Sequence, residues 1–158
     1  MIIYQPIAME CPYCHEIQLI VTNSRSSKGK SQIWRRRKCL ACKEIFTTHE
    51  IIDLSHVVVV KKTGVAEMFS RMKLYSGIFY ASQASKIAKR EMVIDSITRA
   101  IERDILSLKK KKITSEELTD IVLFNLKKKH IPTFLRFLTN CKDISNENQI
   151  KRELAKYL

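Results

Sequence analysis

The sequence contains only three glycines in 158 residues. This scarcity excludes the glycine-rich loops that cradle phosphate groups in many nucleotide-binding enzymes. The sequence also lacks a nucleophile elbow and a recognisable pair of catalytic carboxylates, so we expect a protein that is not an enzyme. No apolar run approaches the roughly 18 residues that a membrane span requires, and no secretory signal peptide is visible. We therefore expect a cytoplasmic protein with no membrane partner and with reduced cysteines.

Acidic side chains are scarce relative to basic ones. The sequence has 29 Lys and Arg against 16 Asp and Glu, a formal net charge of +13 and a pI of about 9.7. Such an excess favours a polyanionic partner, with nucleic acid ahead of an anionic membrane surface. Apolar residues make up 45% of the chain, which indicates a folded protein rather than a disordered one.

Four of the five cysteines form two Cys-x-x-Cys motifs. Cys11 and Cys14 are followed by 24 residues and then by Cys39 and Cys42. In a reducing compartment this arrangement is typical of a structural zinc site, in which four thiolates surround the ion and leave no position open for catalysis. Cys141 lies in an apolar helical stretch, where we expect a small core residue rather than a fifth ligand.

The segment between the two motifs is strongly basic. From Arg25 to Lys43 it contains eight Lys or Arg and no Asp or Glu. Residues 17–23 are predicted to form a strand that ends at 23–25, residues 26–31 a turn, and residues 33–38 an extended run. Arg side chains bind phosphate or guanine through a planar fork, and Trp34 either stacks on a base or sugar or covers a small core. The predicted DNA-binding residues are Arg25, Lys28, Lys30, Trp34, Arg35, Arg36 and Arg37.

The sequence after residue 50 predicts a strand or small sheet followed by four to five helices. The whole chain is therefore predicted to have an α+β fold. Residues 57–60 form a buried-strand pattern, followed by a turn at 61–64. A capping-box pattern at 114–117 opens one helix, and Pro132 suits the first turn of the next. The predicted helices begin near residues 67, 86, 114, 132 and 145, the last of them capped by Ser145.

Lysines surround one glutamate near the start of this second half. Lys61, Lys62 and Lys73 lie close in sequence to Glu67, at the predicted turn and the helix that follows it. Lysine ammonium groups in such an arrangement can hold phosphates, and the glutamate can pair with a lysine or accept hydrogen bonds from a sugar or base. From the residues alone, an ordinary solvated surface with a local salt bridge is favoured.

The motifs taken together resemble the NrdR family, bacterial repressors of ribonucleotide reductase genes. The first half resembles the zinc ribbon of the family, and the second half resembles its ATP-cone, a small sheet over a helical bundle. The matching segments are residues 9–14, 23–25, 35–42, 45–50, 59–64, 67–69, 73–74 and 134–137. This chain departs from the family pattern at Asn23, Trp34 and Ile45, which replace an aspartate and two arginines.

The resemblance implies a zinc-dependent transcriptional repressor that binds double-stranded operator DNA of ribonucleotide reductase genes. It implies one structural zinc ion and homo-oligomerisation controlled by ATP or dATP. The nucleotide-binding residues that it implies are Val60, Lys61, Lys62, Glu67, Lys73 and Leu74. The expected parts of the chain are an N-terminal extension (1–8), a zinc ribbon (9–50), an ATP-cone-like domain (51–144) and a C-terminal helix (145–158). The alternative is a constitutive zinc-ribbon module that binds nucleic acid without nucleotide control.

Overall fold

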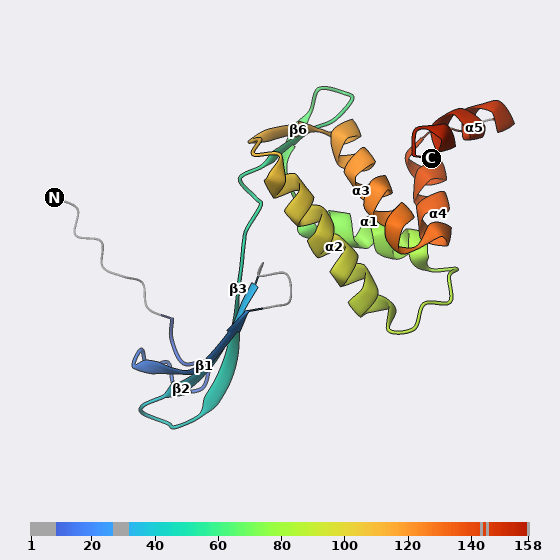
Figure 1. Cartoon of the computed structure of the whole chain (residues 1–158). Coiled ribbons are helices and arrows are strands. Elements are labelled where there is room, and N and C mark those ends of the chain that lie inside the picture. The colour runs from blue at the N-terminus through green and yellow to red at the C-terminus, as the bar shows by residue number, and fades with distance from the viewer. Residues whose placement is uncertain (1–8, 27–31, 143, 145, 158) are drawn as a thin grey trace. The chain divides into compact units, whose positions relative to one another are not determined.

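The structure, a computed structural model, describes residues 9–26, 32–142, 144 and 146–157. The chain divides into two units, with the boundary between Ile52 and Asp53. Each unit has its own three-stranded sheet, and the helices belong to the second unit (Figure 1). The expected α+β fold is therefore confirmed. Among the described residues, no helix combines the length and the apolar character needed to cross a membrane.

The first unit is an antiparallel sheet in the order β1-β2-β3, with β2 in the centre. The strands are β1 (Leu19–Ser26), β2 (Gln32–Cys39) and β3 (Ile45–Ile51). The extended run predicted before the second cysteine motif is confirmed as β2. The prediction that the first strand ends at residues 23–25 is wrong, because pairing with β2 continues through Ser26 after a bulge between Val21 and Asn23. The turn predicted at 26–31, with Lys28 and Lys30, falls largely outside the described residues.

The second unit packs a small mixed sheet against helices. The sheet has the order β5-β4-β6, with β4 (Val58–Val60) antiparallel to β5 (Ala66–Met68) and parallel to β6 (Lys112–Thr114). The helices are α1 (Arg71–Ser82), α2 (Arg90–Ser107), α3 (Ser115–Lys129), α4 (Ile131–Cys141) and α5 (Glu147–Ala155). One buried apolar cluster joins the sheet to the helices, and its members include Val59, Ile78, Ile101, Ile113 and Leu126.

Several local predictions for this unit need correction. Glu67 lies in strand β5 and not in a helix, because the chain first pairs back along β4. Helix α1 starts only at Arg71, where the Ser70 Oγ accepts a hydrogen bond from the Lys73 backbone N–H at 3.3 Å. The N-cap of the last helix is Asn146 and not the predicted Ser145. Cys141, expected in the core, is exposed.

The start of α3 confirms the predicted capping box. The Thr114 Oγ1 accepts a hydrogen bond from the Glu117 N–H at 3.0 Å, and the Glu117 carboxylate accepts one from the Thr114 N–H at 2.8 Å. The Lys110 ammonium donates to the same carboxylate at 2.6 Å, and these interactions lower the pKa of Glu117. The contribution of this ionised carboxylate to stability is therefore complete above the pKa of the unfolded chain, about 4.5, and is lost as the pH falls through the lower folded value.

We expect Thr114→Ala to lower the free energy of unfolding of the second unit by about 1 kcal/mol, because the Glu117 N–H loses its acceptor, the Thr114 Oγ1. Urea denaturation followed by circular dichroism measures this change. Thr63→Ala, in the exposed turn between β4 and β5, is the matched control. Equal losses in the two variants would contradict a capping role for Thr114.

Candidate metal centre, nucleic-acid face and nucleotide site

The four cysteines of the two Cys-x-x-Cys motifs converge in the first unit. Their Sγ atoms all lie within 4.8 Å of one another, with Cys11 3.7 Å from Cys42 and Cys14 3.6 Å from Cys39. Four sulfurs bound to a tetrahedral zinc ion at about 2.3 Å lie about 3.8 Å apart. A disulfide would instead require a sulfur separation of about 2.05 Å. The donor set and its spacing therefore fit a tetrathiolate zinc site.

The two motifs use the same backbone turn. The residue after each motif, His15 or Lys43, has a left-handed conformation with φ of 61° or 67°. The N–H of Cys11 donates to the carbonyl five residues later at 2.9 Å, and the N–H of Cys39 does the same at 3.0 Å. This repetition explains why two motifs that are 24 residues apart present their thiols as matched halves of one cluster.

The close packing of the cluster shifts the pKa values of two of its thiols in opposite directions. Burial raises the pKa of Cys39, but hydrogen bonds from the backbone N–H groups of Cys42 and Ala41 outweigh it and bring the pKa to about 7. The backbone N–H of Glu44 lowers the pKa of Cys42, but burial and the neighbouring thiols raise it to about 12. Four thiolates at this spacing would repel one another, and a divalent cation bound among them would offset the repulsion. Such a cation would bind with release of the thiol protons.

The sheet above this cluster has two different faces. One face, which we call the braced face, carries Arg35, Arg37, Thr48 and Glu50. The Arg35 guanidinium donates to both Glu50 carboxylate oxygens, at 2.6 and 3.2 Å, and the Arg37 Nε donates to the Thr48 Oγ1 at 3.0 Å. The hydrogen bond from Arg35 lowers the pKa of Glu50. Two of the predicted DNA-binding arginines are thus already engaged within the sheet.

The opposite face, which we call the open face, carries the other basic side chains of the sheet. Cross-strand pairing places Trp34 between Arg25 and His49, and places Arg36 between Asn23 and Thr47. Among the described residues of the three strands, no Asp or Glu lies on this face.

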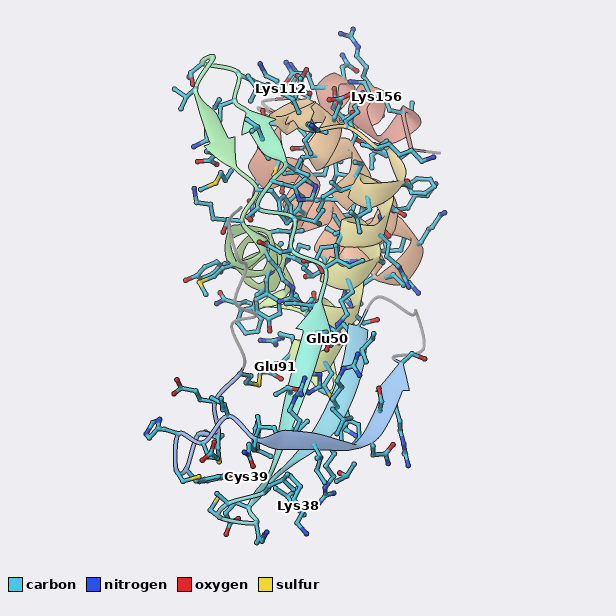
Figure 2. The ribbon with its side chains drawn as sticks, turned by 90° about the vertical axis from the view of Figure 1, so that its left-hand side faces the viewer. Lys38, Cys39, Glu50, Glu91, Lys112 and Lys156 are labelled. Atoms are coloured by element: carbon cyan, nitrogen blue, oxygen red, sulfur yellow. The ribbon has the colours of Figure 1, made fainter. Side chains whose placement is uncertain are left out.

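Arg36 is the most available arginine of the β2 strand. Its side chain is exposed, and it makes no ion pair or hydrogen bond with the described residues. Lys38 lies on the same face next to the buried Cys39, whereas Glu50 lies toward the other end of the sheet (Figure 2). Trp34 is half-buried on the open face. The open face is therefore a basic surface with one aromatic ring, which suits contact with a nucleic acid.

In the second unit, one carboxylate joins two of the predicted phosphate-binding lysines. The Glu67 Oε2 lies 2.8 Å from the Lys73 Nζ and 3.0 Å from the Lys61 Nζ. Hydrogen bonds from Lys73 and Lys61 lower the pKa of Glu67. Lys62 does not join this group, because its Nζ lies 3.6 Å from a carboxylate oxygen of Glu116 on α3.

We call Glu67, Lys61 and Lys73 the Glu67 cluster. A cavity of about 190 Å³ lies beside it. Glu67, Ser70 and Lys73 supply polar groups to its lining, and Leu74 belongs to its apolar part. Val60, the remaining predicted nucleotide-binding residue, ends strand β4 and is half-buried. The other lining residues are Val59, Met68, Phe69, Gly77, Leu118, Thr119, Val122 and Phe137.

Sequence reasoning missed the contribution of α3 and α4 to this cavity. Their residues lie more than forty positions away from Glu67 in the chain, and no local pattern links them to it. Gly77 was an available signal, because it is one of only three glycines and lies inside α1. A Cβ at Gly77 would lie 3.7 Å from the Phe137 ring, which shows how closely the two helices approach at the cavity.

Comparison with known proteins divides the chain in a similar way. Residues 9–50 match the family described as "Transcriptional repressor NrdR-like, N-terminal domain", and residues 57–147 match the ATP cone domain. A transcriptional repressor NrdR of Thermosynechococcus vestitus is 35% identical over 147 residues, covering 93% of this chain and 90% of the relative. The protein of the same name from Carboxydothermus hydrogenoformans is 31% identical over 150 residues, covering 95% and 96%.

The fold, the thiolate cluster and these matches define a protein with a zinc ribbon followed by an ATP cone. The similarity to curated relatives spans almost the whole of both sequences. The chain belongs to the NrdR family of transcriptional repressors. The family resemblance expected from the sequence motifs is thereby confirmed.

Proposed function

We propose that the protein is a zinc-dependent transcriptional repressor that acts in the cytoplasm. It binds double-stranded operator DNA of ribonucleotide reductase genes, and ATP or dATP controls this binding by changing its homo-oligomeric state. The observation that carries the proposal is a basic sheet face built on a four-thiolate cluster, in a family member whose second unit holds a lysine-bordered cavity. The protein is accordingly a regulator and not an enzyme.

DNA contacts are assigned to the open face. Arg25 and Arg36 are exposed there and make no side-chain interaction with the described residues, so their guanidinium groups are available for phosphates or guanine edges. β-Strands are known to read DNA in either groove. Arg35 and Arg37 have a supporting role, because their bonds to Glu50 and Thr48 tie β2 to β3.

Nucleotide binding is assigned to the Glu67 cluster and its cavity. Lys61 and Lys73 supply two positive charges for the phosphates, and the N-terminus of α1, which follows the cavity-lining Ser70, adds its partial positive charge. The apolar part of the cavity, which includes Leu74 and Phe137, suits an adenine ring. Such a site needs no glycine-rich loop, in agreement with the scarcity of glycine.

Nucleotide control requires different nucleotide affinities in different oligomeric states, because equal binding would shift nothing. The second unit exposes apolar surface that subunit contacts can cover. Met68, Met72 and Met92 are 69%, 78% and 68% exposed.

We expect the size of the zinc-loaded protein to differ between ATP, dATP and no nucleotide, as measured by multi-angle light scattering. Lys61→Ala should abolish this difference by removing one of the two phosphate-facing charges. Lys129→Ala, which removes an exposed charge at the end of α3, serves as the control. Identical profiles under all conditions, together with unimpaired DNA binding, would favour the constitutive zinc-ribbon module.

A further inference from the structure

We propose that Glu67 selects nucleotides against free polyphosphates by competing with phosphate for Lys61 and Lys73. The inference rests on the proposed nucleotide site and adds a reason for its selectivity. A ligand must draw both lysines away from this carboxylate, and it binds well only if it also gives the carboxylate new hydrogen-bond donors.

The contacts show that one oxygen atom holds both cations. Glu67 Oε2 accepts from the Lys73 Nζ at 2.8 Å and lies 3.0 Å from the Lys61 Nζ. The three residues come from different elements: Lys61 follows β4, Glu67 lies in β5, and Lys73 lies in the first turn of α1. Glu67 therefore ties the β4–β5 hairpin to the start of α1 as well as neutralising charge.

The exposure of the three side chains shows which partner is free to move. The Glu67 side chain is 30% exposed, whereas those of Lys61 and Lys73 are 47% and 67% exposed. The lysines can turn toward an incoming phosphate, but the carboxylate stays at the cavity that it lines. A phosphate that takes the lysines therefore leaves a partly buried negative charge beside its own charge, which opposes binding.

A nucleotide can offset this cost and a free polyphosphate cannot. The sugar and base carry hydroxyl and amino groups that donate hydrogen bonds, and Glu67 lies where the cavity could present them to its carboxylate. Fully ionised tripolyphosphate has acceptor oxygens but no donor to offer. When ATP binds, its donor groups partly compensate the Glu67 carboxylate for the loss of the two lysines. Tripolyphosphate gives no such compensation.

The test compares ATP and tripolyphosphate binding by calorimetry, without added magnesium, in the full-length zinc-loaded protein and two variants. Glu67→Gln should tighten tripolyphosphate binding roughly three- to tenfold, the size expected for removing one close like charge at a partly exposed site. ATP affinity should change less, so the preference for ATP should shrink. Glu116→Gln is the matched control, because it removes the same charge from a carboxylate that pairs with Lys62.

Several results would overturn the role of Glu67. These are unchanged or weaker tripolyphosphate binding in Glu67→Gln, equal tightening in both variants, and equal tightening for both ligands. If Glu67→Gln does not fold, Glu67→Asp replaces it, since the shorter side chain cannot hold both lysines at their present positions. Failure of the wild-type protein to bind ATP or dATP would instead overturn the proposed nucleotide site itself.

Discussion

Removal of zinc is expected to unfold the first unit while the second unit stays folded. The reason lies in the distribution of buried side chains. Among the described residues of the first unit, only Cys11 and Cys39 are buried, and the large apolar residues of its strands are largely exposed. A structural zinc site of this kind supplies about 10–16 kcal/mol of apparent binding free energy at neutral pH, and here little else can hold the sheet together. The second unit has its own apolar cluster of buried residues.

Amide NMR spectra recorded before and after chelation test this expectation. Signals from residues 9–52 should lose their dispersion, signals from residues 53 onward should persist, and DNA binding should disappear. Cys39→Ser should reproduce the effect, because it removes a buried ligand, whereas Cys141→Ser should retain zinc and DNA binding because Cys141 is exposed and lies outside the cluster. Dispersed ribbon signals after complete zinc loss would show that the sheet is stable without the ion.

Motifs with a fixed local geometry were predictable from the sequence. The two Cys-x-x-Cys motifs, the extended basic strand and the capping box at Thr114 each follow from residue types at short, defined spacings. In α2, Ile94, Ile97 and Ile101 follow one another at helical steps of three and four residues, and all three are buried. In each case the interaction that fixes the structure lies within a few residues of the pattern.

Features that depend on pairing between distant segments were not predictable. Strand β6 has only three residues, begins within a run of four lysines and exists because it pairs with β4, more than fifty positions earlier. Glu67 was expected at the start of a helix, but it lies in strand β5. Its conformation is set by pairing with Val59 of β4, which the local sequence does not reveal. The alternation of Arg35 and Arg36 between faces was visible in the sequence, but the partners that distinguish the faces lie on β3.

This difference between the two sheet faces leads to contrasting expectations for neighbouring arginines. Arg36→Ala should weaken DNA binding about tenfold and leave zinc content and ribbon stability unchanged, because the open-face guanidinium has no partner among the described residues. If Arg36 contacts one phosphate, the slope of log affinity against log salt should become shallower by about 0.9. Fluorescence anisotropy over a series of salt concentrations measures both quantities.

Arg35→Ala is the adjacent control on the braced face. It removes both hydrogen bonds to Glu50, so we expect a lower free energy of unfolding of the zinc-loaded ribbon and a smaller change in the salt slope than Arg36→Ala causes. The opposite result, with the larger slope change in Arg35→Ala, would place the braced face against DNA. Glu50 would then have to release Arg35 when DNA binds, and Glu50→Gln would be expected to strengthen DNA binding. The two arginines therefore decide which face of the zinc-supported sheet meets the operator.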